Sequence, residues 1–222
     1  VKRNDDMKKI ILLTVLLLLL PYLVLLLFFK EEKPLYFEYG ENTYVRVKRE
    51  KKNVIENVPL EEYVVGVLAG EMPTSFDLEA LKAQAVAARS YVLRKMEYAK
   101  KDAFDVVDTV SNQVYLNEEE LKEKWKNEYE EKITKIKTAV RETSGQYLEY
   151  GGKVIEAFFF STSTGVTENS GEVFSTQLPY LKSVDSKWDA DVSPVFQVNY
   201  EFSLADFYTK LNLPYHNPLT IQ

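Results

Sequence analysis

The stretch "VVGVLAGEMPTSF", residues 64–76, carries an apolar run up to one acidic residue, Glu71, and then to a proline, Pro73. Between Pro59 and Glu71, apolar side chains recur at intervals of three and four residues, as on one face of a helix: Leu60, Tyr63, Val64, Val67 and Leu68. A proline disfavours helical conformation in the residue before it. We therefore predict an amphipathic helix that begins at Pro59 and ends near Met72, with Glu71 in its last turn.

Glu71 is the first candidate for a catalytic residue. Its sequence neighbours are apolar or small, so partial burial is expected, and the carbonyl dipoles at a helix C-terminus disfavour a negative charge. A carboxyl group that retains its proton can act as a general acid. The competing interpretation is a surface glutamate that only ends a helix.

Arg89 is the second candidate. It belongs to a helix predicted over residues 76–101, whose apolar stripe consists of Leu78, Leu81, Ala85, Ala88 and Val92. The residues one turn before and after Arg89 are all small or apolar: Ala85, Val86, Val92 and Leu93. An arginine in such surroundings either faces a ligand or forms a buried structural ion pair, and the sequence leaves both interpretations open.

Two β-hairpins are predicted from alternating side chains and turn residues. The first covers residues 44–58, with Val45 and Val47 facing inward. The second turns at Gly151-Gly152, because glycine adopts the positive φ angles of a tight hairpin turn. These hairpins are separated by helical segments, so helices and hairpins occupy different blocks of the chain. That arrangement predicts an α+β fold and not a strict βαβ alternation.

The later elements follow from capping and periodicity. A charged helix or helix pair is predicted over residues 118–141, with Asn117 as its N-cap. Its inward face is predicted to consist of Leu121, Trp125, Tyr129, Ile133, Ile136 and Val140. A strand is predicted over residues 195–202, and a short helix capped by Ser203 over residues 203–211.

Composition excludes several classes of protein. Of 222 residues, 45% are hydrophobic and 28% are charged, as in an ordinary globular protein. The formal net charge of −6, without a long basic run, disfavours nucleic acid as a partner. The chain has no cysteine, which excludes disulfides and thiolate metal sites. Its only histidine is His216, so any Ser-His-Asp triad would have to use that residue.

Residues 10–29, "IILLTVLLLLLPYLVLLLFF", contain no charge and have about the length of a membrane-spanning helix. Basic residues precede this run, and no small-residue cleavage site follows it. We therefore predict an uncleaved transmembrane signal anchor in a single-pass membrane protein. Residues 1–9 are then the cytoplasmic N-terminus, residues 30–42 a linker, and residues 43–222 an extracytoplasmic catalytic domain.

The hydroxyl-rich segment "FFFSTSTGVTE", residues 158–168, contains Ser161 and Ser163. No Ser-x-x-Lys or G-x-S-x-G pattern surrounds them, so ordinary turn chemistry is favoured over nucleophilic catalysis. Hydrogen bonding to a polar ligand is a third interpretation. Tyr180 and Trp188 lie in the long loop that follows, where aromatic rings either fill a core or stack on a sugar.

Four motifs in this order resemble those of the family of stage II sporulation protein D and amidase enhancers. They are "VPLEEYVVGVLAGEMPTSFDLEALKAQAVAARSYVLRK", "VDTVSNQVY", "AFFFSTSTGVTENSGEVF" and "PYLKSVDSKWD". The resemblance covers about residues 40–210. It implies a lytic transglycosylase that cleaves peptidoglycan glycan strands during engulfment in sporulation, without metal or cofactor. It also implies a location in the mother-cell membrane, with the catalytic domain facing the engulfment space. The implied partners are stage II sporulation proteins P and M.

The resemblance also assigns site residues. The glutamate of the family's "EMP" motif, the catalytic acid and base, falls on Glu71, and the arginine of "AxAARxY" falls on Arg89. The residues that line the glycan cleft fall on Ser161, Ser163 and Tyr180. The family's C-terminal "GHGVGMSQYGA"-like segment has no counterpart here, so the chain is expected to be a fragment or a truncated member. A non-catalytic module that binds glycan and activates an amidase, or an inactive truncated member, are the alternatives.

Overall fold

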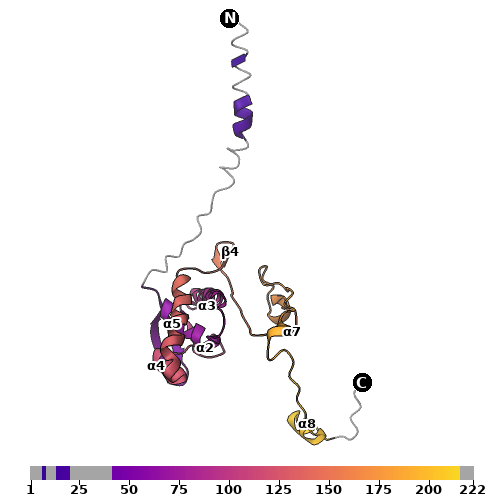
Figure 1. Cartoon of the computed structure of the whole chain (residues 1–222). Coiled ribbons are helices and arrows are strands. Elements are labelled where there is room, and N and C mark those ends of the chain that lie inside the picture. Colours follow the sequence, from indigo (N-terminus) through magenta and orange to yellow (C-terminus); the bar gives the residue numbers. More distant parts are fainter. Residues whose placement is uncertain (1–6, 9–13, 21–41, 216–222) are drawn as a thin grey trace. The chain divides into compact units, whose positions relative to one another are not determined.

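The computed structural model describes residues 7–8, 14–20 and 42–215 of the chain (Figure 1). The chain divides into two compact units, Val1–Phe158 and Phe159–Gln222. The described part of the first unit contains a small sheet and the helices that carry Glu71 and Arg89. The second contains loops and short helices. The mixture of strands and helices confirms the predicted α+β class.

The sheet of the first unit is built on the predicted hairpin. Strands β1 (Tyr44–Arg49) and β2 (Val54–Pro59) pair in antiparallel fashion, and β3 (Val106–Val107) pairs with β1 in parallel. The strand order is β2-β1-β3. Val45 and Val47 are fully buried, as the alternating pattern predicts, and they belong to the core beneath the helices.

Helices α2 (Leu60–Glu71) and α3 (Leu78–Tyr98) follow the sheet. Pro59 is both the last residue of β2 and the N-cap of α2, so the hairpin continues into the helix without a linker. Met72 has extended backbone angles before Pro73, which confirms the predicted end of the helix. Along α3 the buried residues include most of the predicted stripe: Leu81, Ala85, Ala88 and Val92.

The predicted charged segment is a helix pair that packs on α2 and α3 (Figure 1). It consists of α4 (Glu118–Trp125), the 3₁₀ turn η1 (Lys126–Glu128) and α5 (Tyr129–Glu142). Asn117 caps α4 in a capping box, because its side chain accepts the Glu120 N–H at 3.0 Å and its own N–H donates to Glu120 at 2.9 Å. All six residues predicted to face inward are buried: Leu121, Trp125, Tyr129, Ile133, Ile136 and Val140.

The capping box yields a prediction about stability. Asn117→Ala removes one half of the reciprocal bonding, and we expect the free energy of unfolding to fall by about 1 kcal/mol. Asn127→Ala is the matched control, since Asn127 is exposed and its side chain makes no hydrogen bond to a described residue. Urea denaturation of both variants measures the difference. Equal losses would show that the cap contributes nothing.

A second hairpin ends the first unit. Strands β4 (Glu149–Tyr150) and β5 (Lys153–Val154) are joined at Gly151 and Gly152, which have φ angles of 59° and 72°. Left-handed conformation at both central residues is the requirement of a type I′ turn, and glycine meets it without steric cost. The predicted turn is therefore confirmed.

The second unit has short helices, α6 (Ser170–Val173), α7 (Asp189–Val192) and α8 (Leu204–Lys210). The side chain of Ser203 accepts the N–H of Asp206 and caps α8, as predicted. The predicted strand over residues 195–202 is wrong. Its apolar side chains are exposed, and no other segment among the described residues pairs with it. Alternation of side chains does not form a strand where a partner strand is missing.

The membrane predictions require correction. Within the residues that the structure describes, no helix reaches the length and apolarity needed to cross a membrane. This finding overturns the predicted transmembrane helix at residues 10–29, and with it the single-pass membrane placement. Of that range, residues 14–20 are described as helix, and the rest lies outside the described residues. Most of the predicted linker, residues 30–42, lies outside them as well, and so does His216.

Candidate active site around Glu71

Glu71 is the last residue of α2 and lines a cavity of about 780 Å³. Its side chain is half-buried. One wall is the end of α2 with the turn that follows it, and the other comes from α4, η1 and α5. The lining residues outside residues 69–75 are Lys124, Trp125, Glu128, Glu131, Lys132 and Lys135. Cavities of this volume are typical of ligand sites.

The Glu71 carboxylate is held by a backbone donor. The N–H of Val114 donates to Oε1 of Glu71 at 2.6 Å. Among the described residues Val114 is the only hydrogen-bond partner of this carboxylate, and no lysine or arginine forms an ion pair with it. One oxygen is therefore oriented, while the other is available to exchange a proton with a ligand.

Lysines from distant parts of the chain surround the end of α2. The ammonium of Lys124 donates to the carbonyl of Ala69 at 3.2 Å. The ammonium of Lys135 donates to the carbonyls of Thr74, at 2.8 Å, and Phe76, at 2.6 Å. Cations at this position offset the negative end of the helix dipole. No basic residue is adjacent to Glu71 in the sequence, so the local sequence could not have predicted these contacts.

The opposite wall combines an aromatic ring with charged side chains. Trp125 is largely buried and lines the cavity. Lys132 pairs with Glu128 at 3.1 Å, whereas Glu131 is exposed and forms no ion pair with a described residue. Charged side chains bind hydroxyl and amide groups. The lining suits a polar ligand.

Tyr63, in the first half of α2, stacks on Tyr115. The rings of Tyr63 and Tyr115 lie 5.3 Å apart and nearly parallel. Burial raises the pKa of Tyr63 well above its usual value and raises the pKa of Tyr115 to about 12. Both phenols therefore keep their protons at neutral pH. The Tyr63 hydroxyl can donate to the side-chain oxygen of Gln113, which lies 3.2 Å away.

Arg89 forms a buried ion pair, which is one of the two roles that its sequence surroundings left open. It is 0% exposed and contacts both carboxylate oxygens of Glu61, at 2.9 and 2.6 Å. It also donates to the carbonyls of Gln146, at 3.0 Å, and Val140, at 3.4 Å. These bonds tie α3 to the start of α2 and to the end of α5. Direct binding of substrate by Arg89 stays a prediction.

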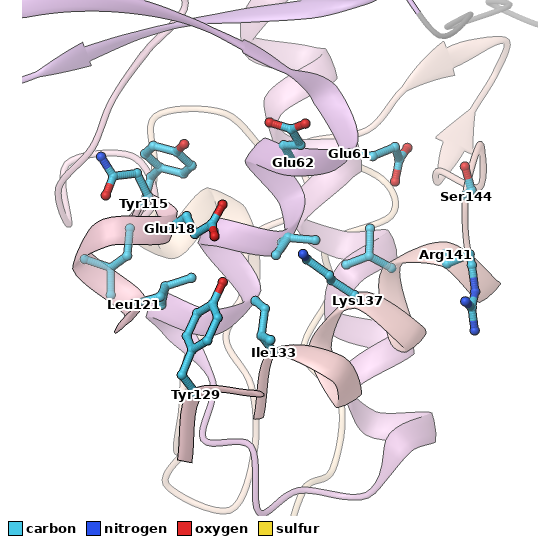
Figure 2. Close-up of a pocket in the computed structure, with 15 residues that line it drawn as sticks. Glu61, Glu62, Tyr115, Glu118, Leu121, Tyr129, Ile133, Lys137, Arg141 and Ser144 are labelled. Carbon is cyan, nitrogen blue, oxygen red and sulfur yellow. The ribbon is translucent and has the colours of Figure 1, made fainter. Parts of the chain in front are cut away.

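Glu61 lines a second cavity, of about 450 Å³, on the first half of α2 (Figure 2). Glu61 and Glu62 project from α2, and Lys137 and Arg141 come from α5. The Glu61 carboxylate already neutralises Arg89. Because Glu71 lines the first cavity and not this one, we take the first as the candidate active site.

Glu61 and Glu62 provide a matched test of the ion pair. Glu61→Ala leaves the buried Arg89 without its counter-charge. We expect a loss of about 3 kcal/mol in unfolding free energy, at the low end for buried pairs because Glu61 is itself partly exposed. Glu62→Ala removes the same charge from the same helical turn but no described partner, and should stay within about 0.5 kcal/mol of wild type. Chemical denaturation measures both, and similar stabilities would refute a structural role for the pair.

The other predicted site residues lie in the second unit. Ser161 is exposed. Ser163 is buried, its hydroxyl bonds to that of Ser186, and its N–H donates to Asp189 at 2.7 Å. Hydrogen bonds from Ser163 lower the pKa of Asp189. Tyr180 is half-buried. Their predicted place in one glycan cleft with Glu71 stays a prediction.

Comparisons with known proteins identify relatives of this chain. The family model SpoIID, described as "Stage II sporulation protein", matches residues 48–150, the stretch that contains Glu71, Arg89 and Val114. The stage II sporulation protein D of Bacillus subtilis is 46% identical over 175 residues, and that of Bacillus amyloliquefaciens 45% over 174. Each of these matches covers 76% of this chain. An amidase enhancer of Bacillus subtilis is 41% identical over 116 residues, which are 52% of this chain and 14% of that protein.

The predicted resemblance is thereby confirmed. Through the domain at residues 48–150, the chain belongs to the stage II sporulation protein D family. It spans about half the length of the two curated sporulation proteins that it matches, 50% of each.

Proposed function

We propose that this protein is a peptidoglycan lytic transglycosylase and that Glu71 is its catalytic acid and base. The observation that carries the proposal is the state of the Glu71 carboxylate. It lines a cavity of about 780 Å³, is oriented by one backbone N–H, and has no ion-pair partner among the described residues. A single mobile proton on an oriented carboxyl group is what this reaction requires.

The reaction explains why one carboxyl group suffices. Most glycosidases need two, an acid and a nucleophile or base. In a lytic transglycosylase, the acid first protonates the oxygen between N-acetylmuramic acid and N-acetylglucosamine. As the bond from C1 to that oxygen breaks, the resulting carboxylate takes the proton of the muramic C6 hydroxyl. The C6 oxygen then bonds to C1, which closes a 1,6-anhydro ring and returns the proton to Glu71.

The cavity supports the choice of substrate class. The lysines on the α4 and α5 side offer positive charge for the carboxylates of muramic acid and its peptides, and the edge of the buried Trp125 adds an apolar part to the lining. The ammonium groups of Lys124 and Lys135 also hold the carbonyls at the end of α2. The resemblance to the family implies that Ser161, Ser163 and Tyr180 also bind glycan.

A second candidate function has its own supporting observation, the 41% identity with a protein named amidase enhancer. In that case the protein binds glycan strands and activates an amidase without cleaving them. The two functions make different demands on Glu71. Cleavage requires its transferable proton, whereas glycan binding requires only a hydrogen-bonding group of the same shape.

Glu71→Gln separates the two functions, because glutamine keeps the shape of the side chain and cannot transfer a proton. We expect the release of anhydromuropeptides to fall by about 10²- to 10⁴-fold, as for loss of a general acid. Retention on insoluble peptidoglycan should be unchanged. Mass spectrometry of the soluble products and a pull-down assay measure the two properties.

Glu123→Gln is the matched control, since Glu123 is an exposed glutamate of α4 that does not line the cavity. It should cleave like the wild type. Near-normal cleavage by Glu71→Gln would exclude Glu71 as the acid. Absence of anhydro products from the wild type, with binding retained, would favour the amidase activator.

A further inference from the structure

The motif "VDTVSNQVY", residues 107–115, has no role in the reaction described above, yet it contacts the candidate catalytic residue. This segment, here called the strap, runs from β3 across α2 to the cap of α4. The N–H of Val114 donates to Glu71 at 2.6 Å. The next residues continue along the helix, because the N–H of Leu116 donates to the carbonyl of Gly66 at 3.4 Å. The strap therefore lies on the face of α2 that leads to Glu71.

Two glycines of α2 allow this close approach. A Cβ atom placed on Gly70 would lie 2.4 Å from the carbonyl oxygen of Val114. A Cβ atom on Gly66 would lie 2.4 Å from the Tyr115 ring and 2.5 Å from the carbonyl oxygen of Leu116. The contacts with Val114 and Leu116 involve backbone, so rotation of a side chain cannot relieve them. Glycine at these positions lowers the stability of the helix, but it allows the strap to approach the helix backbone closely.

The strap is anchored mainly by buried polar groups. Gln113 is 0% exposed and is placed between the Tyr63 hydroxyl at 3.2 Å and the carbonyl of Ala88 at 3.5 Å. Asn112 accepts the N–H of Val107 at 2.9 Å, and its amide lies 3.0 Å from the Tyr91 hydroxyl. These contacts fix the residues on the N-terminal side of Val114 to α2 and α3. A buried amide whose bonds are satisfied on both sides holds one position of the chain.

We propose that the strap is a positioning element for the catalytic acid, with the Val114 N–H as its contact and Gln113 and Gly70 as its positioning residues. The inference rests on the proposed function and deepens it. The backbone donor selects one orientation of the Glu71 side chain, which leaves Oε2 directed to the ligand. Misplacement of a reacting group by about 1 Å can reduce a rate 10²-fold.

The charged groups that line the cavity from the other elements are Lys124, Glu128, Glu131, Lys132 and Lys135. Replacement of residues in the strap leaves all of these in place. A change in kcat on loss of the Val114 N–H thus reports on this hydrogen bond.

Two substitutions at one position test the proposal. Val114→Pro deletes the N–H, and Val114→Ala keeps it while removing the side chain. In the proline variant, we expect kcat for release of anhydromuropeptides to fall about 10- to 100-fold, with glycan binding unchanged. The alanine variant should resemble the wild type in both respects.

Gly70→Ala tests the same proposal if the proline variant does not fold. Alanine favours the helix itself, so a loss of activity arises from displacement of the strap and not from unwinding of α2. We expect the same loss of kcat with retained binding. Wild-type kcat in Gly70→Ala, or equal losses in Val114→Ala and Val114→Pro, would overturn the proposal.

A measurement without turnover separates this inference from the proposed function. In the NMR spectrum, Glu71→Gln should change the chemical shift of the Val114 amide proton, because a neutral amide oxygen accepts a hydrogen bond more weakly than a carboxylate does. Glu123→Gln should leave that chemical shift unchanged. A Val114 amide that does not respond to Glu71→Gln overturns the positioning role, whether or not the protein cleaves glycan. A responsive amide in a protein that releases no anhydro products supports the contact and refutes only the catalytic assignment.

Discussion

The buried guanidinium of Arg49 is the interaction on which the arrangement of the first unit depends. Arg49 is the last residue of β1 and only 2% exposed. It donates to Asp108 at 2.8 Å, to Glu56 at 3.1 Å and to Glu120 at 2.6 Å, and its guanidinium lies over the Tyr115 ring. A buried charge must be matched by opposite charges and hydrogen bonds, because its desolvation is expensive. The hydrogen bonds and ion pairs that satisfy Arg49 therefore join the hairpin, the start of the strap and α4 at one point.

The contacts of Arg49 also affect the candidate active site around Glu71. Asp108 lies near the start of the strap, and Tyr115, its last residue, lies beneath the Arg49 guanidinium. Both ends of the strap are therefore attached to the same arginine, and the middle rests on the glycines of α2. The carboxylate of Glu71 takes its direction from an amide fixed in this way. The sheet contains no residue of the cavity, yet it determines where one wall of the site lies.

The sequence predicted what depends on local pattern. The end of α2 at Pro73, the inward faces of α3 and of the helix pair, and the Gly151-Gly152 turn all follow from spacing and from the conformational limits of proline and glycine. Glu71 was identifiable because a carboxylate at the end of an apolar run is unusual. The strand at residues 195–202 failed because alternation says nothing about whether a partner strand exists.

What the sequence could not show depends on contacts between distant residues. Val114 offers a backbone N–H, which every residue except proline has, so no side chain marks it as part of a site. Arg49 lies in a strand whose other charged side chains look similar, and only the fold places three carboxylates around it. Arg89 was recognised as unusual, but its surroundings fitted two interpretations, and the structure provides Glu61 as its partner.

The separation in sequence between Glu71 and its donor has a consequence for the order of folding. Helix α2 is a local structure and can form early, whereas Val114 lies 43 residues from Glu71 and Asp108 lies 59 residues from Arg49. Contacts over such distances require loop closure and form with the cooperative core. A partly folded chain thus carries the glutamate on its helix but lacks the amide that directs it. For a protein proposed to cut cell wall, completion of the fold is then the step that gives the catalytic acid its orientation.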